Sequence, residues 1–191
     1  MDRNIESYVK IYDVMDESIC SQTLKELVAS NSFEQHNFYR PQDGSFYKPA
    51  GDEELDVSHF VPSTSPAIML ALYSCIQKYL DEYKFNWFDG WSGYTSLRWN
   101  RYTPKHRMSL HCDHIHSMFD GTRKGIPTLT ILGALNTKDI DYTGGEFIMF
   151  EDKEYNMKAG QVMIFPSCFL YPHKVNLVTS GTRYSFVSWV W

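Results

Sequence analysis

The chain has 191 residues, a formal net charge of −5 and aromatic residues at 16% of its positions. This length suits one well-packed domain, because a second would need a linker and no such segment stands out. No run of Lys or Arg is present, so a broad electrostatic footprint for DNA or RNA is not supported. The four cysteines have no paired spacing, which argues against a disulfide framework or a zinc ribbon and favours a reducing compartment.

The first residues and the hydropathy of the chain predict its location. Residues 1–14 alternate charged and polar groups, and no stretch reaches the roughly 18 to 20 consecutive apolar residues that a bilayer span needs. We therefore expect a soluble, cytoplasmic protein without a signal peptide and without a membrane partner.

Two helices are expected before residue 90. Residues 16–30 place apolar side chains at helical spacing behind Asp16, a possible N-cap, and residues 64–84 repeat the apolar pattern. Residues 34–60 lie between them and are rich in turn formers. We interpret this segment as a surface connection; the alternative is a substrate lid, with Tyr39, Arg40 and Tyr47 as its substrate residues.

From residue 94 on, short strand-like runs follow one another, several of them separated by turns that contain glycine. The runs cover residues 94–102, 108–113, 127–136, 145–150, 161–165, 173–178 and 182–190. Such a series is typical of a sandwich or a barrel. We expect one domain, mainly β with flanking helices, in which about residues 1–90 give helical support and about residues 94–191 form the β core.

A possible metal site is carried by His111, Asp113 and His173. Side chains at i and i+2 of a strand point to one face, so a strand would present His111 and Asp113 together. His173 begins a second run of alternating character. Two imidazoles and one carboxylate can hold a divalent metal on one side and leave the opposite positions open. His114 and His116 follow the first motif, and we expect them in a loop.

An arginine follows the distal histidine. If Thr179-Ser180-Gly181 turned the chain into a hairpin, Arg183 would share a face with His173, on the order of 10 Å from the metal. That separation suits a five-carbon diacid whose near end chelates the metal and whose far carboxylate meets the guanidinium in a bidentate pair.

These residues resemble the Fe(II)- and 2-oxoglutarate-dependent dioxygenases, in particular the prolyl 4-hydroxylase-like branch, over about residues 94–191. Further matches lie outside the H-x-D, His and Arg positions. They are Tyr102 nine residues before His111, Gly144-Gly145-Glu146 followed by Phe150, Ala159-Gly160 leading to Phe165-Pro166, Gly181-Thr182-Arg183-Tyr184-Ser185, and Trp189 six residues beyond Arg183.

The sequence also departs from the pattern of that branch. Lys105 and Met108 replace the expected glycine and second tyrosine, and Gly133-Ala134 stand where many relatives have a tyrosine. Arg183 stands where collagen-type prolyl 4-hydroxylases usually have lysine, so the chain looks closer to the oxygen-sensing and bacterial types. These departures affect the pocket more than the metal site.

The resemblance implies a double-stranded β-helix, a cupin-like jelly roll. It implies Fe(II) held by His111, Asp113 and His173, and 2-oxoglutarate held by Arg183, Tyr102 and Thr130. The implied reaction uses O2 to couple C–H hydroxylation of a peptidyl proline to decarboxylation of 2-oxoglutarate to succinate and CO2, with ascorbate as a further cofactor. Trp189 is an additional substrate residue.

Other functions stay open from the sequence alone. One alternative is an oxygenase that hydroxylates a free amino acid or another small metabolite. Another is a non-catalytic jelly-roll module that binds a metal or a ligand. Demethylation of nucleic acid by a related branch ranks last, because no basic groove is visible in the sequence.

Overall fold

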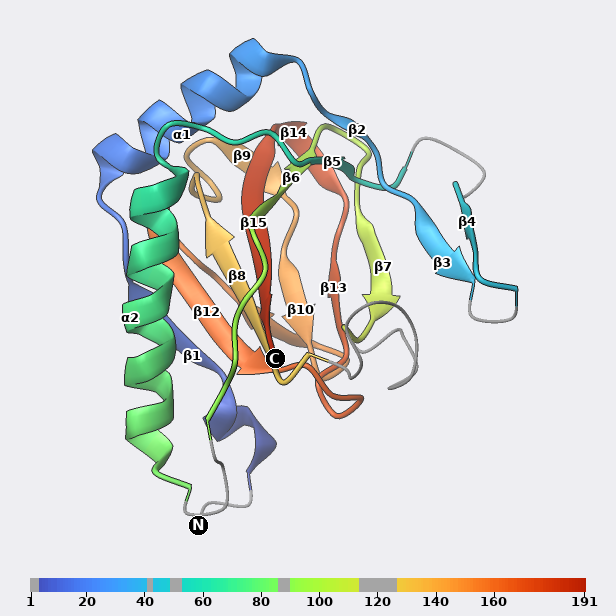
Figure 1. Cartoon of the computed structure of the whole chain (residues 1–191). Coiled ribbons are helices and arrows are strands. Elements are labelled where there is room, and N and C mark those ends of the chain that lie inside the picture. The colour runs from blue at the N-terminus through green and yellow to red at the C-terminus, as the bar shows by residue number, and fades with distance from the viewer. Residues whose placement is uncertain (1–3, 41–42, 49–52, 86–89, 114–126) are drawn as a thin grey trace.

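The structure consists of two β-sheets packed face to face, with two helices on one side (Figure 1). It is a computed structural model, and it describes residues 4–40, 43–48, 53–85, 90–113 and 127–191. The larger sheet has the strand order β1 (Lys10–Asp13), β12 (Gln161–Pro166), β8 (Leu129–Ala134), β15 (Arg183–Val190), β6 (Arg98–Tyr102), β5 (Asp56–Ser58) and β2 (Glu34–Gln35). The smaller has the order β11 (Lys153–Tyr155), β10 (Phe147–Met149), β13 (His173–Val175) and β7 (Met108–His111). The pairs β14 (Val178–Gly181) with β9 (Tyr142–Gly144) and β3 (Phe38–Arg40) with β4 (Ser45–Tyr47) complete the strands.

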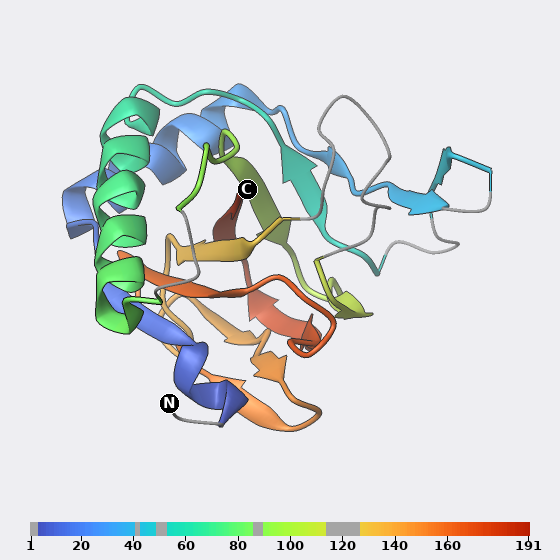
Figure 2. The ribbon, with the colours of Figure 1, turned by 60° about the horizontal axis from the view of Figure 1, so that its bottom comes forward.

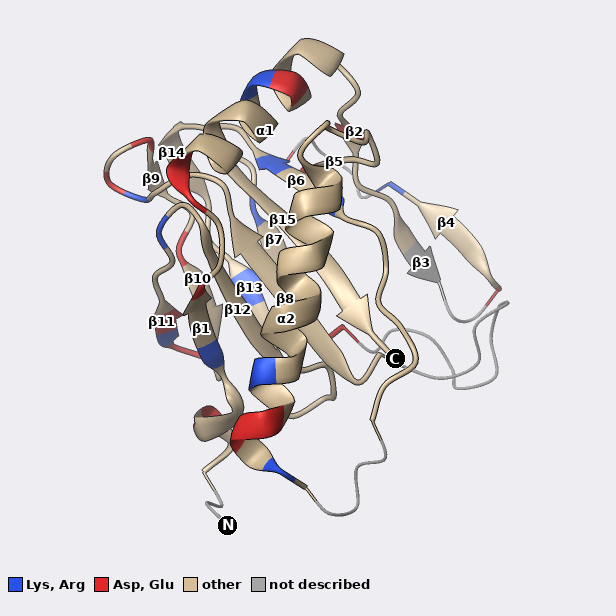
Figure 3. Cartoon of the chain, turned by 60° about the vertical axis from the view of Figure 1, so that its left-hand side comes forward, with Lys and Arg blue, Asp and Glu red and all other residues tan. Residues whose placement is uncertain are grey.

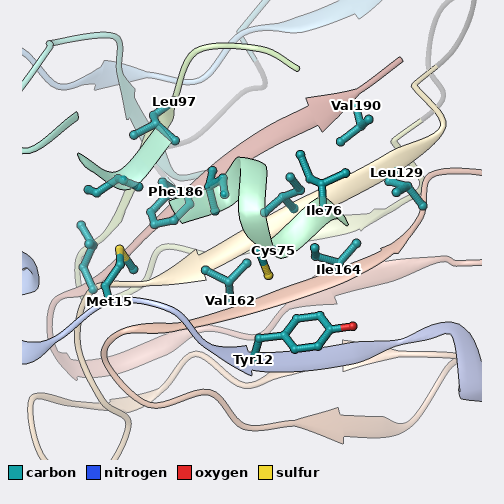
Figure 4. Packing of buried hydrophobic residues seen from close by; sticks show 14 of the residues in the cluster. Tyr12, Met15, Cys75, Ile76, Leu97, Leu129, Val162, Ile164, Phe186 and Val190 are labelled. Carbon is teal, nitrogen blue, oxygen red and sulfur yellow. The ribbon is translucent and has the colours of Figure 1, made fainter. Parts of the chain in front are cut away.

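The larger sheet has an apolar layer on each face. Along β8, Leu129 and Ile131 pack toward the helices α1 (Glu17–Ser30) and α2 (Ser65–Tyr83), while Leu132 and Ala134 belong to the layer between the sheets. This division follows from the alternation of side chains along a strand. Figure 4 shows the first layer, in which Ile76 of α2 lies close to residues of β8, β12 and β15. The fold is the expected jelly roll.

The N-terminal part supplies strands as well as the expected helices. β1 pairs with β12 at one edge of the larger sheet, and β5 and β2 extend its other edge beyond β6. Figure 2 shows the short helix η1 (Ile5–Tyr8) and β1 running beside α2. The sequence did not predict these strands, because two to four residues are too few for alternation to stand out from chance.

The predicted hairpin before Arg183 is wrong. β14 pairs with β9, and β15 pairs with β6 and β8, so the chain leaves one sheet and enters the other at Gly181. Gly181 has φ +69°, and a Cβ there would lie 2.2 Å from the carbonyl oxygen of Asp141. The strand predicted over residues 145–150 is present in shorter form as β10, and it follows Gly145, which has φ +64° and separates it from β9. Glycine geometry, which alternation does not encode, decides these breaks.

Residues 34–60 contain paired strands and are more regular than the predicted surface connection. β3 and β4 form a hairpin that projects from the sheets (Figure 1). Within it the Tyr47 ring lies 6.0 Å from that of Phe38, and Phe46 is 67% exposed. The side chains of Tyr39 and Arg40 lie outside the described residues, as do His114 and His116.

The distribution of charged residues and the character of the helices complete the description of the fold. On the face in Figure 3, acidic and basic residues of the described chain are interspersed and form no continuous basic stripe. Among the described residues, neither helix combines the length and the apolar character required to cross a bilayer.

Gly133 provides a test of the packing between β8 and β15. It lies opposite Phe186, and a Cβ at this position would come within 2.0 Å of the Phe186 ring, which is fully buried against Trp99. We predict that Gly133→Ala lowers the free energy of unfolding in urea by about 1–3 kcal/mol, because the added methyl group overpacks the core. Adding Phe186→Leu should recover part of the loss. A Gly133→Ala chain as stable as the parent would contradict this packing.

Candidate metal centre

The smaller sheet brings His111 and His173 together. His111 ends β7 and His173 begins β13, and the two are directly opposed in the antiparallel register, with ring centroids 4.3 Å apart. Asp113 follows two residues after His111 in a bend, not inside the strand as predicted. One potential ligand atom from each residue lies within 4.8 Å of the other two. The three residues that the sequence singled out therefore do converge.

Hydrogen bonds to the backbone orient both imidazoles. The Nδ1 atom of His111 lies 2.7 Å from the carbonyl oxygen of Ser109, and that of His173 lies 3.1 Å from the carbonyl oxygen of Tyr171. A carbonyl only accepts, so each Nδ1 carries the hydrogen and each Nε2 keeps its lone pair. These Nε2 atoms lie 3.5 and 3.8 Å from Oδ1 of Asp113. Two lone pairs and one carboxylate oxygen thus face a common point, as a divalent metal requires.

Asp113 is held from its other side by the hydroxyl of Thr130, which is itself oriented by Ser167. Thr130 Oγ1 donates to Oδ2 of Asp113 at 2.6 Å. Because the single hydroxyl hydrogen of Thr130 is used there, the 2.8 Å contact between Thr130 and Ser167 must have Ser167 as its donor. The chain Ser167, Thr130, Asp113 fixes the carboxylate and leaves Oδ1 toward the histidines. Thr130 was predicted to contact 2-oxoglutarate; its observed partner is the carboxylate.

The charge states of the cluster suit a cation. Burial alone would raise the pKa of Asp113, but His173, His111 and the hydroxyl of Thr130 outweigh it and hold the pKa well below its ordinary value. Burial lowers the pKa of His173 to about 4. Near neutral pH the cluster therefore offers an ionised carboxylate and a neutral His173 imidazole, the forms that bind metals.

A cavity between the sheets extends from the cluster. Its walls come from strands of both sheets and from residues next to β5 and β7. They are Leu55, Arg98, Asn100, Tyr102, Met108, His111, Asp113, Thr130, Leu132, Phe147, Phe165, His173, Val175 and Val187. Apolar walls with a few convergent polar groups are typical of a small-molecule site.

The predicted arginine and tyrosine lie together on the larger sheet. Arg183 and Tyr102 are opposed residues of β15 and β6, and the guanidinium carbon lies 4.9 Å from the centre of the Tyr102 ring. Both are buried, and Arg183 Nη1 donates to Ser185 Oγ at 3.1 Å. One of its five N–H groups is thereby used, which leaves others for a carboxylate. The position of Arg183 is set by the pairing of β15 with β6, and not by the predicted hairpin.

The polar residues of β6 were not singled out from the sequence. Arg98 and Asn100 precede Tyr102 at intervals of two, and all three line the cavity. The interval of two was a usable signal once Tyr102 had been assigned to the site. Trp189, predicted to meet substrate, is opposed to Thr130 across β15 and β8 and stacks on the guanidinium of Arg98 at 4.9 Å. His36, also unpredicted, contacts Arg98 through Nε2 at 3.3 Å.

Thr130 allows a test of how Asp113 is held. We predict that Thr130→Val weakens the binding of a divalent metal by about 10- to 100-fold, because the carboxylate loses its orienting hydrogen bond. Thr130→Ser keeps the hydroxyl and should bind nearly as tightly as the parent. Calorimetric titration with Zn2+ measures both, and equal affinity of the valine and serine variants would refute this role.

His36 gives the protein a predictable response to acid. Burial, then Arg98 and His111, lower the pKa of His36 to about 4, whereas an unfolded histidine titrates near pH 6.5. The unfolded chain therefore binds more protons between these values, and stability falls as the pH drops from about 6.5 to 4. We predict that His36→Gln reduces this loss in metal-free protein, measured by urea unfolding at several pH values. An unchanged pH dependence would rule the contribution out.

Comparison with known proteins identifies related sequences over the β core. Residues 97–191 match the family model described as the 2OG-Fe(II) oxygenase superfamily. A PKHD-type hydroxylase of Crocosphaera subtropica is 33% identical over 98 residues, which are 50% of this chain and 42% of that protein. A procollagen-lysine,2-oxoglutarate 5-dioxygenase of Drosophila melanogaster is 34% identical over 92 residues, 47% of this chain and 11% of that protein. The chain thus matches less than half the length of these relatives.

Solved structures resemble nearly the whole chain. A prolyl-4-hydroxylase of Pseudomonas putida superimposes with a TM-score of 0.67 at 14% identity, covering 96% of this chain and 91% of that one. A prolyl hydroxylase of Trichoplax adhaerens in complex with a hypoxia inducible factor peptide fragment gives a TM-score of 0.67 at 18% identity, with coverage of 96% and 83%. At these identities the likeness establishes the fold, including the N-terminal part that the sequence relatives do not cover.

Proposed function

Because residues 97–191 belong to the 2OG-Fe(II) oxygenase superfamily, we propose that the protein is an Fe(II)- and 2-oxoglutarate-dependent dioxygenase of the prolyl 4-hydroxylase-like type. The observation that carries the proposal is the convergence of two Nε2 lone pairs and Oδ1 of Asp113, with each Nδ1 fixed by a backbone carbonyl. A non-catalytic jelly roll has no need of this arrangement together with a buried arginine beside it.

The donor set fits ferrous iron. His111, Asp113 and His173 would occupy one face of the ion, and their side of the cavity leaves the opposite face open to ligands. When bound, the iron supplies the oxidising chemistry that uses O2 and 2-oxoglutarate to hydroxylate a C–H bond. The protein contributes orientation, since the hydroxyl of Thr130 fixes the carboxylate and the strand pair β7–β13 fixes the imidazoles.

Arg183 is the group we assign to the far carboxylate of 2-oxoglutarate. It is 4% exposed, and a buried guanidinium that meets a carboxylate gains a strong, directional pair. Tyr102 lies beneath it, and burial raises the pKa of that phenol, so the hydroxyl remains a donor at neutral pH. Leu132, Phe147 and Phe165 line the cavity and would exclude water around the co-substrate.

The substrate we propose is a prolyl group, in the first instance a peptidyl proline. Support comes from the neighbour described as a prolyl hydroxylase with a peptide fragment. In this proposal Trp189 would form a wall of the substrate site, and Tyr39, Arg40 and Tyr47 of the hairpin of β3 and β4 would contact the peptide. Participation of ascorbate and a cytoplasmic location remain predictions.

Asp113 is the most direct residue to change. We predict that Asp113→Ala abolishes both Fe(II) binding and 2-oxoglutarate turnover, because the carboxylate is the anionic ligand. Calorimetry with Zn2+ as a redox-inert substitute reports binding, and release of succinate from the purified protein reports turnover. Asp56→Ala is the matched control. It removes a carboxylate of β5 that pairs with Arg101, a residue on the face of β6 turned away from the cavity. Unimpaired turnover by the Asp113 variant would defeat the assignment.

Arg183 should affect the co-substrate alone. Removing one partner of a buried, hydrogen-bonded charge pair costs roughly 2–5 kcal/mol, so we predict that Arg183→Ala raises the KM for 2-oxoglutarate by roughly 30-fold or more. The affinity for Zn2+ should stay near that of the parent. Arg101→Ala removes an arginine that lies outside the cavity and should leave the KM unchanged. An unaltered KM in the Arg183 variant would show that the far carboxylate binds elsewhere.

A further inference from the structure

Arg98 is an arginine that lines the metal cavity, and the reaction proposed above does not use it. It lies on β6, four residues before Tyr102 and on the same face of the strand. Its Nη1 contacts Nε2 of His36 at 3.3 Å, and its guanidinium stacks on the ring of Trp189 at 4.9 Å. Its Nε is enclosed and has no hydrogen-bond partner among the described residues.

The contact with His36 determines which nitrogen of that imidazole carries the hydrogen. Burial, then Arg98, lowers the pKa of His36 to about 4, so the ring is neutral at pH 7. A guanidinium only donates, which makes Nε2 of His36 the acceptor and leaves the hydrogen on Nδ1. That Nδ1 is also enclosed and without a partner in the described chain, as is Nε1 of Trp189.

Three enclosed donors thus gather around one guanidinium, namely Nε of Arg98, Nδ1 of His36 and Nε1 of Trp189. An enclosed donor without an acceptor costs about 1–3 kcal/mol, more for a charged group, so three at one place indicate that a ligand completes them. Asn100 Oδ1, two residues along the same face of β6, is an enclosed acceptor without a partner in the described chain, so donors outnumber acceptors here by three to one. An excess of donors calls for an acceptor, and a charged donor favours an anionic one.

Asp113 is the carboxylate that acts on Arg98, but both of its oxygens have other partners. Oδ2 accepts from Thr130, and Oδ1 faces the two histidines and the metal position. Glu54, another buried carboxylate, accepts from Ser109 through Oε1, and its Oε2 is enclosed without a partner in the described chain. It is not among the groups that act on the charge of Arg98, which are Asp113 and Tyr102. In the proposed complex, the two positive charges of the metal ion are balanced by Asp113 and by the near carboxylate of 2-oxoglutarate. The far carboxylate balances the charge of Arg183. The positive charge of Arg98 then remains uncompensated.

We propose that Arg98, supported by His36 and Trp189, binds a carboxylate of the substrate beside the metal. This inference rests on the proposed function and narrows its substrate class. The carboxylate belongs either to the residue that is hydroxylated, as in a free amino acid, or to an acidic residue next to it in a peptide. In both cases a neutral amide in its place binds less tightly, because it cannot compensate the buried guanidinium.

Calorimetry on the full chain loaded with Mn2+ and 2-oxoglutarate tests the inference with two matched pairs of probes. L-Proline is compared with L-prolinamide, and acetyl-Gly-Pro-Asp-amide with acetyl-Gly-Pro-Asn-amide. In at least one pair the acid should bind tenfold or more tightly than the amide, and the pair that discriminates identifies the source of the carboxylate. Arg98→Gln should remove the difference in affinity between acid and amide. Arg101→Gln, three residues further along β6 and on its other face, should keep that difference.

The outcomes separate this inference from the proposal on which it rests. Failure to load Mn2+ and 2-oxoglutarate overturns both. Normal loading with equal affinity for acid and amide in both pairs overturns the role of Arg98 alone, and so does a preference that survives Arg98→Gln. A weaker affinity of that variant for 2-oxoglutarate, with the acid preference intact, would assign Arg98 to the co-substrate instead. The comparison of acid and amide on the parent chain stands even if the variant does not fold.

Discussion

The antiparallel pairing of β7 with β13 is the constraint on which the site depends. It sets His111 directly opposite His173, and backbone carbonyls two residues before each histidine fix the two rings. Because each Nδ1 is used in this way, the two Nε2 lone pairs point at the same place before any metal arrives. Asp113 then needs only to be turned toward that place, which Thr130 achieves from the other sheet. The candidate metal position is thus shaped by both sheets together.

The two sheets contribute different kinds of side chain to the site. The smaller sheet supplies the imidazoles, and the larger sheet supplies Arg98 of β6 to the cavity wall. Arg183 on β15 is opposed to Tyr102, which lines the same cavity. Because β15 and β6 run antiparallel, Arg183 meets Tyr102 at one end while Trp189 and Arg98 meet at the other. The same pairing would place the dicarboxylate we propose near one end of these strands and the anionic substrate we propose near the other. This division links the order of the strands to the chemistry we propose.

Part of this arrangement was predictable from the sequence. Periodicity located both long helices and the strands that carry His111, His173 and Arg183, and the spacing of His111, Asp113 and His173 was sufficient to predict that these three converge. The partner of β14 was not predictable, because the positive φ of Gly181 moves the chain to the other sheet where a hairpin was expected. Arg98 and His36 were missed since neither belongs to a motif; only the assembled cavity shows that their donors lack acceptors.

The central claim is that His111, Asp113 and His173 bind one metal ion through the atoms that already converge. A crystal structure of the full chain with Zn2+ and 2-oxoglutarate tests it most directly. The account predicts one ion at about 2.0–2.2 Å from both Nε2 atoms and from Oδ1 of Asp113, with the far carboxylate of the diacid on Arg183. An ion bound through Nδ1, or located away from these three residues, would contradict it.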